Sequence, residues 1–114
     1  MGHNLADSNF KELLLWLMRL RQRFRVTGAS MFPLLQPGDE VLIDSRAFRH
    51  QLPQIGDIVV AHHPTQAGVQ IVKRVSAVHP NRTLQLKGDN PGESSDFDNM
   101  VVGQIIGRVT SRFG

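Results

Sequence analysis

The stretch GASMFPLLQPGDEVLID, residues 28–44, places Ser30 in a turn-rich segment and then changes to an alternating apolar run. Glycine supplies the positive φ that a tight turn needs, and aspartate hydrogen-bonds back to the chain, so Pro-Gly-Asp at residues 37–39 predicts a turn. The alternation that follows predicts a strand over residues 40–44. A stable core does not require a hydroxyl at Ser30, so we interpret this serine either as a residue with no functional role or as a nucleophile.

The same turn chemistry precedes a second strand. Gly-Asp-x-Val occurs at residues 38–41 and again at residues 56–59, and the second copy predicts a strand over residues 57–61. Runs of β-type residues between turn residues predict further strands, over residues 69–78, 84–87 and 101–109. With about six strands in all, we expect a mostly β domain over residues 26–114.

Residues 1–25 are expected to form a loose lead-in and an amphipathic helix. Asn9 is a suitable cap, with Glu12 three residues later reaching back as in a capping box. Large apolar residues then recur at helical spacing, at Phe10, Leu13, Leu14, Leu17, Leu20 and Phe24. Either this helix packs on its own domain, or residues 10–25 bind a partner or a membrane surface, with their arginines on anionic headgroups. The sequence does not separate these interpretations.

Composition restricts the function classes. With 114 residues, 40% apolar and 20% charged, the chain is expected to form one globular domain. The absence of cysteine excludes disulfides, thiolate catalysis and cysteine-based zinc sites. Adjacent His62 and His63 would point to opposite faces of a strand, so no metal site is expected there. The net charge of +3 permits nucleic-acid binding, but the chain has no tyrosine and only scattered phenylalanines for stacking, so we expect no nucleic-acid partner.

No segment is suited to crossing a membrane. The longest apolar run, residues 13–18, is far shorter than the roughly 20 residues that a helical span needs. Arginines follow this run rather than precede it, which is not the pattern of a secretory signal. We therefore expect a soluble, cytoplasmic protein that is at most bound to a membrane surface.

The strand VQIVKRVSA, residues 69–77, carries a lysine on its apolar face. Side chains alternate between the two faces, and one face holds Val69, Ile71, Lys73, Val75 and Ala77. Lys73 either extends to water at a sheet edge or is held desolvated, which lowers the pKa of its amine. A neutral lysine can take a proton from a hydroxyl such as that of Ser30. Because no histidine lies in a recognisable His/Asp/Ser arrangement, a Ser-Lys dyad is the chemistry that suits this sequence.

Four motifs in chain order carry a resemblance to type I signal peptidases. Residues 28–35 with Pro-Gly-Asp at 37–39 are similar to the family's nucleophile box, Ser-Met-x-Pro-Thr-Leu followed by Gly-Asp. The other three are Gly56-Asp57-Ile58-Val59, Val72-Lys73-Arg74-Val75, and Gly88-Asp89-Asn90 with Ser94-Ser95-Asp96. The resemblance implies a mostly β, single-domain peptidase fold shared with LexA-type repressors, with one N-terminal helix.

The resemblance also implies roles for individual residues. Ser30 would be the nucleophile, with its backbone N–H in the oxyanion hole, and Lys73 would be the general base. Ser94 matches the serine that hydrogen-bonds the lysine. Gly28 occupies the position where some members carry a side-chain donor, so only main-chain donors are expected there. No cofactor or metal is implied.

Three further features of these motifs are expected to have supporting roles. Met31 would line the pocket and support the nucleophile turn, and a role as core filler is equally compatible. Asp96 matches a structural acid near the site, but Phe97-Asp98 replaces the Ser-Arg that usually follows it, so the usual Asp–Arg pair cannot form there. The Gly-Asp-Asn of residues 88–90 is expected to be turn scaffolding.

The short chain and its approach to the serine, residues 13–28, resemble the soluble maturation proteases of nickel-type superoxide dismutase. This implies a serine endopeptidase that removes the N-terminal leader of a precursor polypeptide, with the nickel belonging to the substrate. Three alternatives remain. The chain could process other exported precursors, or be an inactive binding module of the same fold. It could also be a self-cleaving regulator, although its only Ala-Gly bond, Ala67-Gly68, lies between the serine and the lysine.

Overall fold

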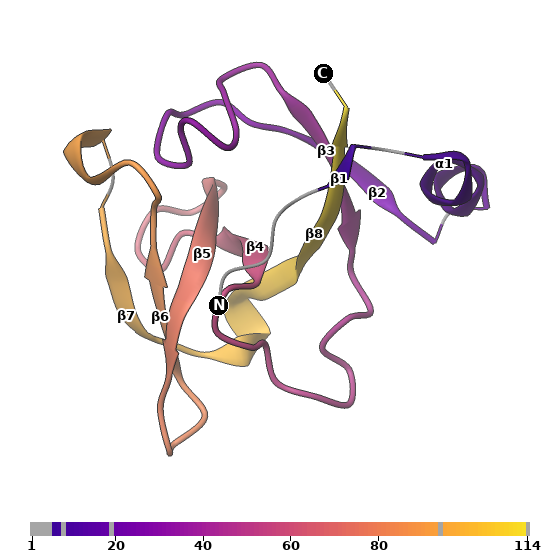
Figure 1. Ribbon diagram of the computed structural model, residues 1–114. Coiled ribbons are helices and arrows are strands. Elements are labelled where there is room, and N and C mark those ends of the chain that lie inside the picture. Colours follow the sequence, from indigo (N-terminus) through magenta and orange to yellow (C-terminus); the bar gives the residue numbers. More distant parts are fainter. Residues whose placement is uncertain (1–5, 8, 19, 94, 114) are drawn as a thin grey trace.

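The computed structural model describes residues 6–7, 9–18, 20–93 and 95–113 (Figure 1). The elements, in chain order, are β1 (Ala6–Asp7), α1 (Phe10–Leu17), β2 (Gln22–Arg25), β3 (Glu40–Asp44), β4 (Ile58–His62), β5 (Gln70–Val78), β6 (Leu84–Lys87), the 3₁₀-helix η1 (Pro91–Glu93), β7 (Phe97–Met100), the 3₁₀-helix η2 (Val102–Gln104) and β8 (Ile105–Phe113). The described part of the chain therefore has one α-helix and is otherwise mostly β, which confirms the expected fold class.

The strands form one curved sheet in the order β2-β3-β8-β4-β5-β6-β7 (Figure 1). All neighbours on this path are antiparallel, and β1 pairs with β8 in parallel. Strand β4 lies in the middle, and its first four residues are buried on both faces, as their continuous apolar sequence Ile-Val-Val-Ala requires.

Alternate residues of β4 enter two hydrophobic clusters, one on each face of the sheet. Ile58 and Val60 pack with residues of β3, β8 and the segment 31–35. Val59 and Ala61 pack with residues of β5, β6 and β7. The two clusters lie on opposite faces of β4, so both are built on this central strand.

The two turns predicted from Gly-Asp-x-Val have the expected geometry. Gly38 and Gly56 have φ values of 94° and 98°. The Asp39 carboxylate accepts a hydrogen bond of 2.9 Å from the backbone N–H of Gln36. Asp57 does the same at 2.9 Å for the backbone N–H three residues before it. Strand β3 starts directly after the first turn and β4 directly after the second, which confirms the repeated turn chemistry.

The N-terminal helix begins as predicted but is shorter. The Asn9 side chain caps it by accepting a hydrogen bond of 3.0 Å from the backbone N–H of Glu12. The helix ends at Leu17, and Phe24, which was expected on it, lies instead on β2, paired with Val41 of β3. The alternation of arginines with other residues in this segment has period two, which is the period of a strand. This signal outweighed the helical spacing.

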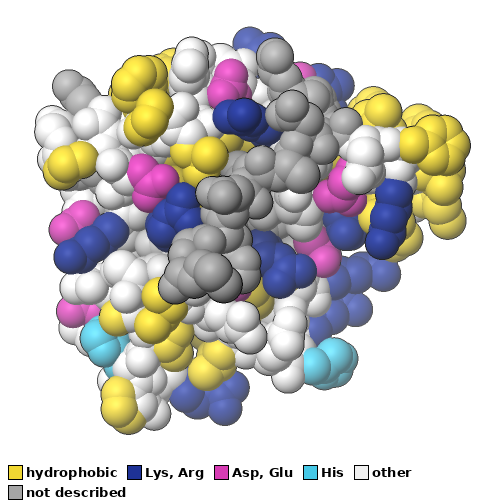
Figure 2. Space-filling model, in the orientation of Figure 1, with side chains coloured by type: hydrophobic (Ala, Val, Ile, Leu, Met, Phe, Trp, Pro, Cys, Tyr) yellow, Lys and Arg dark blue, Asp and Glu magenta, His cyan; other side chains and the backbone are white. Residues whose placement is uncertain are grey.

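The apolar stripe of α1 does not pack on the domain, and the helix contacts the domain through its other side, so the interpretations of the helix stay open. No residue of α1 is buried, and Phe10 and Leu17 are 80% and 70% exposed. The half-buried residues are on the other side of the helix, where Glu12 pairs with Arg21 (3.3 Å) and Arg23 stacks on the Trp16 ring (5.4 Å). Figure 1 shows α1 beside β2 at the rim of the sheet, and Figure 2 shows hydrophobic side chains gathered at that rim.

The expected start of the last strand needs correction, and one strand of the sheet was not predicted. Residues 102–104 form a 3₁₀-helix, so the last strand begins at Ile105 rather than at residue 101. Strand β7 was not predicted, because its sequence Phe-Asp-Asn-Met lacks β-branched residues. In the part of the chain that is described, no helix has the length and hydrophobicity of a membrane span.

Candidate active site

Ser30 lies in a compact turn that follows β2. Backbone hydrogen bonds from Phe32 N to Ala29 O (3.2 Å) and from Leu35 N to Met31 O (2.9 Å) close this turn. Met31 and Leu35 are fully buried in the cluster that contains Ile58 and Val60. Met31 thus supports the turn from within the core, and it is not among the residues that line the adjacent cavity. Of its two expected roles, the structure favours the core filler.

Lys73 is buried in the middle of β5. Only 4% of this residue is exposed, so its side chain does not reach water as the snorkelling interpretation requires. Burial lowers the pKa of the Lys73 amine, and the negative charge of Asp96 partly opposes this effect. Of the two possibilities that the sequence left open, the structure therefore supports the desolvated lysine with a lowered pKa.

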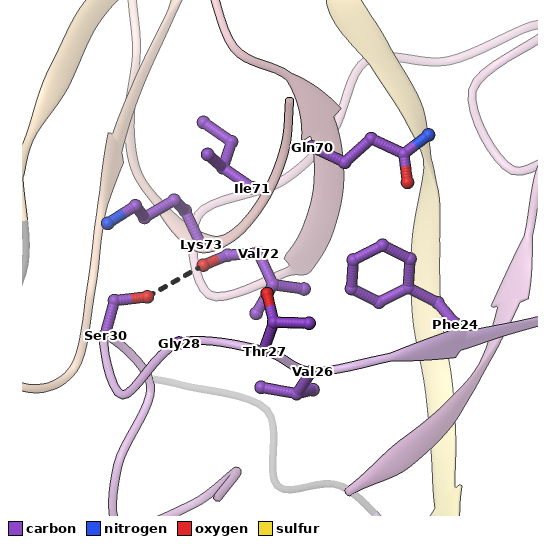
Figure 3. Close-up of a pocket in the computed structure, with 9 residues that line it drawn as sticks. All are labelled: Phe24, Val26, Thr27, Gly28, Ser30, Gln70, Ile71, Val72 and Lys73. Atoms are coloured by element: carbon purple, nitrogen blue, oxygen red, sulfur yellow. Dashed lines mark hydrogen bonds between the residues drawn. The ribbon is translucent and has the colours of Figure 1, made fainter. Parts of the chain in front are cut away.

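Ser30 and Lys73 line the same cavity, of about 130 Å³. The nine lining residues are Phe24, Val26, Thr27, Gly28, Ser30, Gln70, Ile71, Val72 and Lys73. In Figure 3 the serine and the lysine lie at the same end of the cavity, and Phe24 and Gln70 lie at the other. The Ser30 hydroxyl donates a hydrogen bond of 3.3 Å to the Val72 carbonyl oxygen, so the nucleophile turn touches the residue next to the lysine.

The Gly-Asp-Asn segment holds the turn that carries Ser30 against β5. The backbone N–H of Asn90 donates to Ser30 O (2.8 Å), and its side-chain amide donates to Ala29 O (3.0 Å). Asp89 accepts two hydrogen bonds of 2.9 Å from Arg74, the residue after the lysine. The expected turn scaffolding is therefore present, and it connects the serine to the lysine strand. The sequence feature that corresponds to this contact is the charged Arg74 on the polar face of β5, which bonds to Asp89.

The other candidate residues have different positions. Gly28 lines the cavity, and a Cβ there would meet nothing within 4 Å, so the space of a missing side-chain donor is open. Asp96 is exposed and acts on Lys73 through its charge. Ser94 lies outside the described residues. Asp98, which replaces an arginine of the family pattern, pairs with His79 instead (2.6 Å).

One residue near the lysine was missed by sequence reasoning. The ring centroid of Phe97 is 5.7 Å from Lys73 Nζ. From the sequence, Phe97-Asp98 indicates only the loss of the Asp–Arg pair of the family pattern. The sequence could not show that the new ring faces the lysine, because β7 itself was not predicted.

A mostly antiparallel β domain with a single α-helix among its described residues is consistent with the class of signal peptidase-like folds. Comparison of the sequence with protein-family models agrees, since residues 12–96 match the model described as signal peptidase, peptidase S26. The chain belongs to this family.

Two curated relatives are similar to parts of the chain. A "Probable signal peptidase I-1" of Synechocystis sp. is 34% identical over 68 residues, which covers 54% of this chain and 34% of that protein. The "Mitochondrial inner membrane protease subunit 2" of Danio rerio is 31% identical over 118 residues, which covers 82% of this chain and 64% of that protein. The chain thus spans about a third of one relative and somewhat less than two thirds of the other. No solved structure gives a significant match.

Proposed function

We propose that this protein is a serine endopeptidase in which Ser30 is the nucleophile and Lys73 the general base. The observation that carries the proposal is the burial of Lys73 in the wall of the cavity that Ser30 also lines. A lysine with a lowered pKa can accept the proton of a serine hydroxyl, which a solvated ammonium cannot do near neutral pH.

The proposed reaction uses residues already on the cavity wall. Ser30 Oγ attacks the carbonyl carbon of the scissile peptide, and the Lys73 amine takes the hydroxyl proton. The resulting ammonium gives this proton to the leaving amine, and water then hydrolyses the acyl-enzyme with the same lysine as base. The backbone N–H of Ser30 would face the developing oxyanion. Gly28 has no side chain to add a second donor.

The proposed substrate is the N-terminal leader of a precursor protein, bound in extended form. The resemblance of residues 13–28 to the nickel-type superoxide dismutase maturation proteases supports that dismutase precursor as the substrate and a cytoplasmic location. The names of the two relatives, a signal peptidase and a membrane protease subunit, support the alternative of other exported precursors. A panel of purified precursors, analysed by intact mass, distinguishes these substrates.

The dyad is tested by single substitutions in the purified protein. We expect Ser30→Ala and Lys73→Ala each to lower precursor cleavage by at least about 10³-fold, with unchanged circular dichroism. Ser76→Ala is a matched control, since Ser76 lies on the same strand and its hydroxyl bonds to Gln85. Cleavage retained by either dyad variant would rule the mechanism out.

The same protein separates the remaining alternatives. An acylating probe that labels Ser30 in the parent, and not in Ser30→Ala, would exclude an inactive binding module. Incubation of the pure protein followed by intact mass tests self-cleavage. We expect the mass to stay constant, and a cut at Ala67-Gly68 would point to the self-cleaving regulator.

We also propose that residues 10–25 contact a membrane surface peripherally. The support is the exposed apolar stripe of α1, at Phe10, Leu13, Leu14 and Leu17, together with the exposed Arg25 of β2. In flotation with anionic vesicles we expect the protein to rise with the lipid, and Leu17→Asp to weaken this binding. Equal flotation of both proteins, or none of the parent protein, would contradict the proposal.

A further inference from the structure

Phe97 covers the lysine from outside the substrate cavity. It is the first residue of β7, pairs in register with Leu86 of β6, and is half-buried against the second core cluster. Its ring centroid lies 5.7 Å from Lys73 Nζ. The ring is not among the residues that line the cavity.

The ring is held in place by contacts on two sides. The His63 imidazole packs against it in a T-shaped arrangement, with centroids 5.0 Å apart and planes at 79°. The His63 ring is itself oriented, because its Nδ1 accepts hydrogen bonds of 3.1 Å from the backbone N–H groups of Thr65 and Gln66. The residue after Phe97, Asp98, pairs with His79 at the end of β5. The aromatic ring thus has a fixed place over the amine.

The ring has two opposite effects on the amine. Its face attracts a cation, which favours the ammonium. Its bulk also keeps water away from the nitrogen, which favours the neutral amine. Burial is the leading cause of the lowered pKa of Lys73, and the Phe97 ring is one of the groups packed near its amine.

Among the described residues, the charged groups named below do not account for this lowering. Asp96, which precedes β7, favours the ammonium. On the β4 side the register partner of Lys73 is Val59, which is uncharged. On the other side, Asp89 is held by Arg74, and Lys87 of β6 is exposed in register with that arginine.

We propose that Phe97 is a positioning residue that keeps the Lys73 amine dry and so sets the pH range in which the Ser30–Lys73 pair works. This inference rests on the proposed function. In the family pattern this position precedes an arginine that pairs with Asp96. In this chain the ring of Phe97 takes the place of that ion pair. The neighbouring Asp98 pairs with His79 and so fixes β7, the strand that carries Phe97.

The test compares Phe97→Ala, Phe97→Leu and the parent in the full chain, by the rate of labelling with an acylating probe between pH 6 and pH 11. We expect the pH limb set by the lysine to move upward in Phe97→Ala, with a rate at pH 7 lower by about tenfold for each unit of pKa. Phe97→Leu should restore most of the rate, because leucine also excludes water. The KM for a peptide substrate should change little, since the ring lies outside the cavity.

A purely structural role would have a different signature. Phe48, which packs on the same core cluster, is the matched control, and Phe48→Ala should leave the pH limb in place. An unchanged limb in Phe97→Ala, or an equal loss of rate at every pH, would overturn the inference.

A second measurement keeps this test separate from the proposed function and from any folding defect. The NMR titration of ¹³C-labelled lysine reports the pKa of Lys73 directly, with Lys73→Met identifying its signal. We expect that pKa to rise from the parent to Phe97→Leu, and further in Phe97→Ala where this variant folds. If Ser30→Ala keeps its cleavage activity, the proposed function fails. If the dyad variants are inactive but the Lys73 pKa is the same with Phe97 and with leucine or alanine, only this inference fails.

Discussion

At the scale of single residues, the site combines a destabilising group with a set of bonds that hold it. A lysine that is 4% exposed loses most of the hydration of its ammonium, which costs stability. Around it, Asn90 and the Asp89–Arg74 pair bind the nucleophile turn to the lysine strand through short hydrogen bonds. Fixed placement of this kind suits the proposed roles of Ser30 as nucleophile and Lys73 as base.

Lys73→Met should stabilise the protein at neutral pH. The folded state lowers the pKa of Lys73, so below that pKa the folded protein holds a buried ammonium that the unfolded chain keeps in water. The cost is present below the folded pKa and disappears as pH rises towards the unfolded value of about 10.4. We expect a gain of about 0.5–2 kcal/mol in the free energy of unfolding at pH 7, measured by urea denaturation. The gain should shrink by pH 10, and a gain that is independent of pH would contradict the prediction.

Asn90→Ala should impair the reaction more than the fold. Its side-chain amide donates to Ala29 O, and the loss of one such bond costs about 1 kcal/mol of stability. A small displacement of the nucleophile turn should lower the acylation rate by about 10- to 100-fold, measured with a serine-directed probe. Asn81→Ala, which alters an exposed turn at Thr83, is the control and should react normally.

At the scale of elements, the two halves of the sheet are joined by close contact of β8 with β3 and β4. The register of β8 shifts against both neighbours, between Leu42 and Ile43 of β3 and between Val60 and Ala61 of β4. Gly107 lies in this region, paired with Val60. A Cβ at Gly107 would come within 2.4 Å of the Ile43 side chain and 2.6 Å of the Asp44 carbonyl oxygen. The backbones approach this closely because position 107 has no side chain.

Gly107→Ala should therefore destabilise the protein. The Asp44 carbonyl belongs to the backbone of β3 and cannot move aside without disturbing that strand. We expect a loss of about 1–3 kcal/mol in the free energy of unfolding. Gly103→Ala is the matched control, since a Cβ there meets nothing within 4 Å, and its effect should stay within about 0.5 kcal/mol. Equal effects of the two substitutions in denaturant titrations would refute the close approach.

At the scale of the whole molecule, the fold buries its core on both faces of one curved sheet and leaves α1 outside. The helix presents its apolar stripe to solvent, so its large side chains contribute area to the surface rather than to the core. This separates a stable domain from an appended helix that is available for contact with something else.

Two leucines distinguish this arrangement from a helix packed on the domain. Leu17 is 70% exposed and Leu35 is fully buried. Leu17→Ser should change the free energy of unfolding by no more than about 0.5 kcal/mol, whereas Leu35→Ala should cost about 2–5 kcal/mol. Thermal or chemical unfolding measures both, and a large loss in Leu17→Ser would mean that the stripe is buried in solution.

The local features were readable from the sequence because short-range chemistry decides them. The strand over residues 40–44 and the strand over residues 84–87 have their predicted bounds, since turn residues and alternating side chains mark both. The cap at Asn9 follows from a hydrogen bond within one helical turn. The lysine on the apolar face of its strand and the Gly-Asp turns are also local features that the sequence makes readable. The boundary expected between residues 25 and 26, and the roles of Ser30 and Lys73, stay predictions.

The contacts between segments that are far apart in the sequence were decided by the tertiary structure alone. The sequence left open whether the Lys73 side chain extends to water or is desolvated. Packing among β4, β6 and the turn that carries Ser30 buries it. The sequence could not place Phe97 over the amine, make β2 a strand by pairing it with β3, or turn the stripe of α1 outward. The physical reason is the range of the interactions. Turns, caps and alternation act over a few residues, whereas desolvation depends on which distant atoms displace water, and only the closed sheet determines those.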